Sequence, residues 1–257
     1  MKFARFSKGP VGAEISYGVL EGTTVEEISS TPFLPWERTG ITHEVAEVRL
    51  LAPCLPSKIV AIGVNYKDHA AEMGRELPDV PVAFFKPSTS VIGPDDEVMW
   101  PQGSENVSFE GELAVVAGAV ARRVKRGDWK DVILGYTCAL DMTARDFQAV
   151  DLQWARAKGF DTSGPLGPFI ETDLDPSNLG IKTTVNGDVK QDARTDQLIF
   201  GVPEIIEFVT SYITLLPGDV VLTGTPSGVG PVADGDIVEV EIEGIGKLGV
   251  RIRGPKG

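Results

Sequence analysis

The stretch Val107–Gly118, VSFEGELAVVAG, places two acidic residues inside an apolar run that is typical of a buried strand. On one continuous strand, Glu110 and Glu112 are two positions apart, so both carboxylates would project from the same face. Two like charges on a partly buried face repel each other, and each is costly to remove from water. The stretch therefore predicts a strand and requires something that offsets the repulsion.

Strand patterns extend from this stretch in both directions. FARF, ISYGVL and VEEI lie near the N-terminus, KIVAIGVN begins at Lys58, and further runs cover Val82–Phe85 and Val132–Leu140. DIVEVEIEGIGKLGVRI alternates strictly and turns at Gly244–Gly246. Two helices are expected, one in YKDHAAEMG and one after Pro203. Strands outnumber helices, which predicts an α+β fold that is predominantly β with a few short helices.

Glycine-rich turns separate the short N-terminal strands, and PCLP, residues 53–56, is typical of a connector. The chain is long enough for one large domain with a small appendage. We therefore predict a small N-terminal β region over residues 1–54 and a main domain over residues 55–257.

The composition is that of a soluble globular protein, with 42% hydrophobic and 24% charged residues. A net charge of −13 disfavours nucleic acid and anionic membranes as partners. Met1–Pro10 lacks a continuous apolar stretch, and no apolar run of about 18 residues occurs. Cys54 and Cys138 are far apart, which argues against a disulfide framework or a zinc site. We expect a cytoplasmic protein with no nucleic-acid or membrane partner.

Three acids suggest a metal site. Asp141 ends the apolar run ILGYTCALD, and together with Glu110 and Glu112 it offers oxygen ligands only. Such a set suits Mg²⁺ or Mn²⁺ rather than zinc or copper, and the cation would offset the repulsion between the glutamates. The alternative is a solvated strand face, which is the interpretation we give to the three glutamates of VEVEIE, Glu239, Glu241 and Glu243.

Two further patterns could carry chemistry. On a helix, His69 and Glu72 lie three apart, so the carboxylate could orient the imidazole for proton transfer; the alternative is an ordinary surface pair. Lys158 in RAKGFDTSGPLGP and Lys86 in FFKPSTS are expected in or beside loops, where they are either solvated or held over a pocket.

The glycine-rich TGTPSGVGP, residues 223–231, lacks the Gly-Lys-Ser/Thr of a phosphate-binding loop and the strand–helix setting of a dinucleotide fold. Its backbone N–H groups could hold a carboxylate instead.

Taken together, these segments resemble the fumarylacetoacetate hydrolase family. The resemblance runs from about Lys58 to the C-terminus through AIGVNYKDHAAEMG, FFKPSTSVIGP, VSFEGELAVVAG, GYTCALDMTARDFQ, AKGFDTSGPLGP and LLPGDVVLTGTPSGVGP. It implies a mixed β-sandwich roll and a homodimer. It also implies metal ligands, a catalytic lysine with a His–Glu dyad, and residues that line the substrate pocket. The implied metal ligands are Glu110, Glu112 and Asp141. The implied catalytic lysine is Lys158, and the implied dyad is His69 with Glu72. The residues implied to line the substrate pocket are Lys86, Arg145, Gln148 and Thr225.

The resemblance further implies a 2-oxo acid substrate and an enolate that a bound Mg²⁺ or Mn²⁺ stabilises. We expect C–C bond cleavage, either hydrolysis of an acylpyruvate or decarboxylation of oxaloacetate. The alternative reaction is that of a 2-hydroxyhepta-2,4-diene-1,7-dioate isomerase or 5-oxopent-3-ene-1,2,5-tricarboxylate decarboxylase. An alternative of another class is a non-catalytic protein that binds metal or an oxo acid. Residues 68–80 are a candidate lid over the site.

Overall fold

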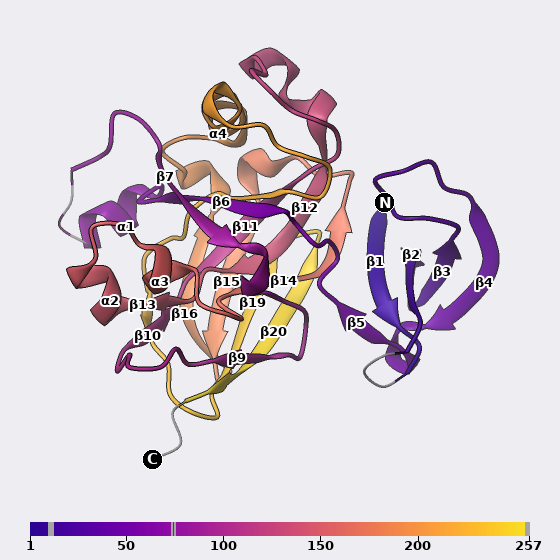
Figure 1. The fold of residues 1–257 in the computed structure, drawn as a ribbon, viewed down its shortest axis with the longest axis horizontal. Helices are drawn as coiled ribbons and strands as arrows, with labels where there is room; N and C mark the ends of the chain where they lie inside the picture. Colours follow the sequence, from indigo (N-terminus) through magenta and orange to yellow (C-terminus); the bar gives the residue numbers. More distant parts are fainter. Residues whose placement is uncertain (10–12, 73, 75, 255–257) are drawn as a thin grey trace.

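The computed structural model describes residues 1–9, 13–72, 74 and 76–254. Strands dominate these residues and the helices are short, so the predicted α+β class, predominantly β, is confirmed. Figure 1 shows the N-terminal strands as a lobe beside the main body, with the short helices α1, α2 and α3 on the opposite side. No helix in the described part of the chain is long and apolar enough to cross a membrane.

The largest sheet has twelve strands and runs through both the N-terminal lobe and the main body. In spatial order its main path is β4 (Arg38–Glu44), β3 (Thr24–Ile28), β2 (Ile15–Glu21), β1 (Lys2–Ser7), β14 (Gly164–Glu171), β12 (Ile133–Leu140), β11 (Gly111–Ala117), β17 (Val220–Leu222), β6 (Lys58–Gly63) and β7 (Val82–Pro87). Two short strands join beside this path, β5 (Arg49–Leu51) on β1 and β8 (Val91–Ile92) on β14.

A five-stranded sheet forms the second layer. Its order is β16 (Asp188–Arg194), β15 (Gly180–Val185), β19 (Ile237–Ile242), β20 (Gly246–Arg253) and β9 (Glu97–Met99). Strands β15, β19 and β20 contact β11, β12 and β14 of the large sheet. Apolar side chains of both layers, such as Leu113 and Val240, form one buried cluster. Because β11 lies inside the large sheet and under this second layer, all seven of its residues are buried.

The third sheet shows that the stretch Val107–Gly118 is not the one continuous strand that the sequence predicted. Val107–Phe109 forms β10, which lies between β13 (Thr143–Ala144) and β18 (Gly230–Pro231), whereas β11 begins at Gly111 in the large sheet. The single strand expected here is therefore two strands in different sheets, and Glu110 lies at the break between them. The apolar pattern continues across the break because β10 and β11 are both buried.

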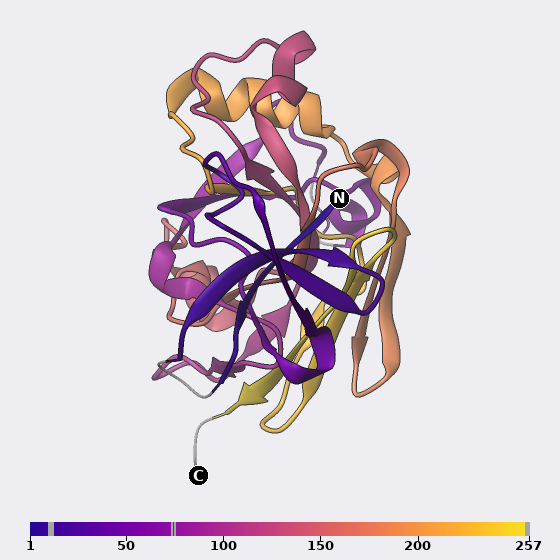
Figure 2. The ribbon, with the colours of Figure 1, turned by 90° about the vertical axis from the view of Figure 1, so that its right-hand side faces the viewer.

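The two expected helices are present. They are α1 (Lys67–Glu72) and α4 (Val202–Tyr212), and α4 carries Pro203 in its first turn. In Figure 2, α4 lies along the top of the molecule behind the N-terminal strands. Two short α-helices, α2 (Arg145–Val150) and α3 (Ala155–Lys158), were not predicted. The described residues also contain five 3₁₀ turns, η1 (Val45–Glu47), η2 (Ser88–Ser90), η3 (Arg126–Val132), η4 (Pro176–Asn178) and η5 (Thr195–Gln197).

Candidate active site

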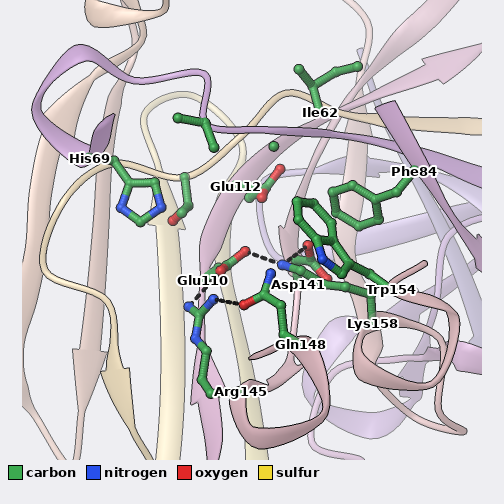
Figure 3. Close-up of a pocket in the computed structure, with 13 residues that line it drawn as sticks. Ile62, His69, Phe84, Glu110, Glu112, Asp141, Arg145, Gln148, Trp154 and Lys158 are labelled. Carbon is green, nitrogen blue, oxygen red and sulfur yellow. Dashed lines mark hydrogen bonds and ion pairs between the residues drawn. The ribbon is translucent and has the colours of Figure 1, made fainter. Parts of the chain in front are cut away.

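Most of the residues singled out from the sequence meet at one small cavity of about 30 Å³. Eight of the ten predicted site residues line it, namely His69, Glu110, Glu112, Asp141, Arg145, Gln148, Lys158 and Thr225. Ile62, Phe84 and Trp154 form an apolar wall, and the rings of Phe84 and Trp154 meet edge to face with centroids 5.5 Å apart. Figure 3 shows Phe84 and Trp154 beside Lys158, with His69 and Arg145 on the other side of the view.

The three predicted metal ligands lie together. Glu110, Glu112 and Asp141 are buried, and each offers one oxygen such that the three oxygens lie within 4.8 Å of one another. The pairing of β11 with β12 sets Gly111 opposite Leu140, which brings both glutamates beside the residue that follows β12. The backbone N–H of Asp141 also donates to the carbonyl of Glu110 at 2.8 Å. The acids thus converge from two neighbouring strands.

Three cations, Lys158, Arg145 and Lys86, already neutralise part of this cluster. The Lys158 ammonium donates to Glu110 Oε2 at 2.6 Å and to Asp141 Oδ2 at 2.7 Å. The Arg145 guanidinium donates to Glu110 Oε1 at 2.6 Å and to Gln148 Oε1 at 2.9 Å. Burial opposes ionisation of Glu110, but Lys158 and Arg145 outweigh it and lower its pKa to about 2. Removing one partner from such a buried pair typically costs about 3–5 kcal/mol, because the other charge is left uncompensated.

Glu112 differs from the other two acids because its carboxylate forms no ion pair with the residues that the structure describes. Its Oε2 accepts one hydrogen bond, from the backbone N–H of Gly224 at 2.6 Å. Burial and the negative charges of Asp141 and Glu110 raise the pKa of Glu112 well above its ordinary value. A further cation at these oxygens would remove that penalty, so the all-oxygen donor set fits a hard divalent ion such as Mg²⁺ or Mn²⁺.

Lys86 lies behind the cavity and does not line it. Its side chain is fully buried, and its ammonium donates to Asp141 Oδ1 at 2.8 Å and to the backbone carbonyl of Lys158. Burial lowers the pKa of Lys86 further than Asp141 raises it. In this structure Lys86 holds a predicted metal ligand and the end of α3; a direct contact with substrate stays a prediction.

Lys158 is in a different setting from the one expected. It ends helix α3 and only 3% of it is exposed, whereas the sequence predicted a loop. Burial lowers its pKa, but Asp141 and Glu110 raise it more, so the net shift is upward and the ammonium stays charged. Its Nζ also lies 5.0 Å from the centre of the Phe84 ring.

The His69–Glu72 pair is formed on α1, where His69 Nδ1 lies 3.0 Å from Glu72 Oε2. The glycine-rich loop, residues 223–231, forms hydrogen bonds with the acidic side chains of this helix. Gly228 N–H donates to Glu72 Oε1 at 3.0 Å, and the Ser227 hydroxyl donates to Asp68 at 2.6 Å. Backbone N–H groups of this loop therefore bind carboxylates, as predicted. The carboxylates are the side chains of Glu72 and Glu112.

The candidate lid over residues 68–80 is described only in part, because Met73 and Arg75 lie outside the described residues. Its first turn contributes His69 to the cavity. Closure of this segment stays a prediction.

Sequence reasoning missed several residues that the structure brings to the site. Phe84 and Lys86 share one face of β7, a period-two signal that could have placed Phe84 near the cavity. Trp154 precedes α3, and Gln191 lies beneath the glutamates on β16. Neither carried a recognisable signal, since both depend on how distant segments pack.

Two family models match the chain. The one described as Fumarylacetoacetate (FAA) hydrolase C-terminal matches residues 58–253. The other, described as Rv2993c-like, N-terminal, matches residues 1–53.

Individual proteins agree with this match. The chain is 42% identical to oxaloacetate tautomerase fahd2, mitochondrial, from Xenopus laevis, over 79% of this chain and 68% of that protein. The crystal structure of 2-hydroxyhepta-2,4-diene-1,7-dioate isomerase from Mycobacterium marinum is 44% identical with a TM-score of 0.89, covering 98% of each chain. Maleylpyruvate hydrolase from Sphingobium sp. SYK-6, solved with manganese(II) and pyruvate, is 32% identical with a TM-score of 0.81, covering all of both chains.

Proposed function

Because the chain belongs to the fumarylacetoacetate hydrolase family, we propose that it is a divalent-metal-dependent enzyme that cleaves a C–C bond in a short 2-oxo acid. The observation that carries the proposal is the buried cluster of Glu110, Glu112 and Asp141, in which Glu112 forms no ion pair with any described residue. The Sphingobium relative, solved with manganese(II) and a 2-oxo acid, supports the same pairing of metal and substrate class.

The cluster would hold Mg²⁺ or Mn²⁺ through Glu110, Glu112 and Asp141. When bound, the cation supplies Lewis-acid stabilisation of negative charge that develops on a substrate oxygen. Lys158 lies at the same two carboxylates and adds a fixed positive charge to the cavity.

Proton transfer is assigned to His69. Glu72 holds the ring through Nδ1, which leaves Nε2 as the nitrogen that exchanges a proton with water or substrate. Glu72 is itself held by Gly228 N–H. The pair can therefore deprotonate a water for hydrolysis, or deliver a proton to the carbon beside the 2-oxo group.

The second candidate reaction is isomerisation. The 44% identity to the Mycobacterium marinum isomerase favours it, and the His69–Glu72 pair can move a proton along a chain without cleaving it. A tautomerase reaction, as in the Xenopus laevis relative, needs the same proton transfer. All three reactions develop negative charge on a substrate oxygen, which a cation held by Glu110, Glu112 and Asp141 would stabilise.

A substrate panel on metal-stripped protein, with and without Mg²⁺ or Mn²⁺, tests the proposal. The panel holds oxaloacetate, acetylpyruvate, fumarylpyruvate and 2-hydroxyhepta-2,4-dienedioate, each followed by ultraviolet absorbance and product analysis. We expect metal-dependent release of pyruvate from at least one compound. Metal-dependent isomerisation without pyruvate would favour the second candidate. Metal binding without any turnover would favour a non-catalytic binding protein.

We also propose that the protein is a homodimer, on the resemblance to the family. Analytical ultracentrifugation should give twice the mass of the chain; a single-chain mass at micromolar concentration would contradict it.

A further inference from the structure

Gln191 is a buried amide behind the glutamates, on the edge strand β16 of the five-stranded sheet. Only 1% of it is exposed. Its Oε1 accepts from Gly111 N–H at 3.0 Å, and its Nε2 donates to Thr225 Oγ1 and to Pro226 O, both at 2.8 Å. Both N–H donors and the oxygen of this one side chain are therefore engaged, each with a residue of the active-site strand or of the glycine-rich loop.

Hydrogen bonds to Gln191 and Thr225 hold both peptide groups of Gly111, the residue between Glu110 and Glu112. Gly111 N–H is held by Gln191, and the Gly111 carbonyl accepts from the Thr225 hydroxyl at 2.9 Å. Gln191 and Thr225 also bond to each other, so the two side chains and the Gly111 peptide groups form a closed ring of hydrogen bonds. Gly111 begins β11 where the chain changes sheets, so this ring fixes the backbone that directs Glu110 and Glu112.

The backbone around Gln191 is shaped for this approach. The pairing of β15 with β16 shifts between Thr183 and Thr184, which leaves Lys190 as the extra residue of a bulge beside Gln191. A Cβ on Gly228 would lie 2.0 Å from the Lys190 carbonyl, and a Cβ on Gly111 would lie 2.0 Å from Thr183 Oγ1. Bulges re-aim side chains near functional sites, and interior glycines mark close approaches between segments.

We propose that Gln191 is a positioning residue that sets the geometry of the metal-binding carboxylates through Gly111. The inference rests on the metal site in the proposed function. Neither glutamate touches Gln191 directly; the effect passes through the peptide groups on either side of Gly111. Along the sequence, Gln191 is 80 positions from Gly111 and 34 positions from Thr225, so the ring joins three separate segments of the chain.

The alternative is that Gln191 serves packing alone, and the two roles have different consequences. A packing role lowers the stability of the protein with or without metal. A positioning role changes metal affinity beyond any change in stability, since residues behind the ligands of a metal typically alter affinity by about 10–100-fold.

The test compares Gln191→Met with Lys190→Met. Methionine keeps the length of glutamine and removes all three hydrogen bonds, and Lys190 is the exposed neighbour on the same strand. We expect Gln191→Met to weaken Mn²⁺ binding by about 10–100-fold in isothermal titration calorimetry. We also expect it to change the Mn²⁺ electron paramagnetic resonance spectrum. Lys190→Met should match the wild type in both.

Circular dichroism and the Tm of the metal-free proteins show whether each variant is folded. If Gln191→Met does not fold, Thr225→Val decides, because it removes only the hydroxyl of the ring and should weaken Mn²⁺ binding in the same direction. Folded variants whose affinity stays within twofold of the wild type, with an unchanged resonance spectrum, would overturn the inference. A wild type that binds no Mn²⁺ would overturn the metal site of the proposed function instead, and this inference with it.

Discussion

The same pattern of alternating glutamates occurs twice in this chain with opposite outcomes. In β11 and the residue before it, Glu110 and Glu112 are buried among apolar residues. In β19, burial alternates along the strand, and the glutamates lie on its outer face; the Glu239 side chain is 30% exposed beside Lys247. The second pattern is the solvated strand face that the sequence predicted.

The difference comes from the layers around each strand. β11 is an inner strand of the large sheet and is covered by the five-stranded sheet, whereas β19 has one face in solvent. A carboxylate in β19 is therefore hydrated at little cost. A buried carboxylate at β11 needs a cation. Glu110 pairs with Lys158 and Arg145, whereas Glu112 forms no ion pair within residues 1–9, 13–72, 74 and 76–254. The burial of Glu112 without an ion pair among the described residues, rather than the sequence pattern, supports the proposed metal site.

Glu112→Gln should have the largest effect on activity. Glutamine keeps the shape and removes the charge, so metal-dependent turnover should fall by more than about 10³-fold, since one electrostatic group alone contributes about 10²–10³. The metal-free variant should unfold at the same or a higher temperature, because a buried, uncompensated carboxylate is lost. Glu241→Gln on β19 is the control and should leave turnover unchanged. Wild-type turnover by Glu112→Gln would exclude it from the reaction.

Lys158→Ala removes the cation that bridges two of the acids. We expect kcat to fall by about 10²–10³ in a protein that stays folded. Lys247→Ala, which removes the lysine beside the exposed Glu239, should retain full activity. Steady-state kinetics of the two variants on the same substrate measures the effect, and near-wild-type activity would remove Lys158 from the mechanism.

Added Mn²⁺ or Mg²⁺ should stabilise the wild type and not Glu110→Ala. A ligand that binds only the native state contributes about 2.7 kcal/mol at a free concentration of 100 times its Kd. Thermal unfolding in millimolar metal measures the shift. The absence of a metal-dependent shift in the wild type would contradict the metal site.

Asp219 is a buried carboxylate that, unlike Glu112, has its own ion pair, with Lys58. It accepts from Ser57 and from Leu216 N–H at 2.7–2.9 Å, and it pairs with Lys58. Burial raises its pKa, but Lys58 and these donors lower it more, so the folded pKa lies below the ordinary value. Its contribution to stability is therefore present above the unfolded pKa of about 3.9 and is lost as pH falls through the folded pKa.

Asp219→Asn should lower the free energy of unfolding at pH 7 by about 2 kcal/mol, the range of a hydrogen bond to a charged group. The difference from the wild type should shrink as the pH approaches the folded pKa, and the Mn²⁺-dependent stabilisation should remain. Denaturant unfolding at several pH values checks this; a difference that stays constant down to acid pH would contradict the assigned ionisation.

The sequence was informative where a pattern is local. Strict alternation predicted β19 and β20, helical spacing predicted α4, and the spacing of His69 and Glu72 predicted a pair that the structure contains. The family and the β-rich class also followed from motifs that can be read directly along the chain. The roles of the site residues stay predictions.

Features that depend on packing could not be predicted in the same way. The change of sheet at Glu110 cannot be seen in the sequence pattern, because the strands on both sides of it are buried and predominantly apolar. Lys158 follows a pattern that is typical of a loop, yet a four-residue helix, α3, places it in the interior. In QDAR of β16 the only apolar residue is the small Ala193, a weak signal that did not indicate that Gln191 is buried on the same face.

The central claim is that Glu110, Glu112 and Asp141 hold a divalent cation. Anomalous diffraction from crystals of the metal-stripped protein soaked in Mn²⁺ tests it most directly. We expect one strong peak per chain among these three carboxylates, and no such peak in crystals of Glu112→Gln. No peak at this cluster, with ions found only at exposed acids such as those of β19, would contradict the account.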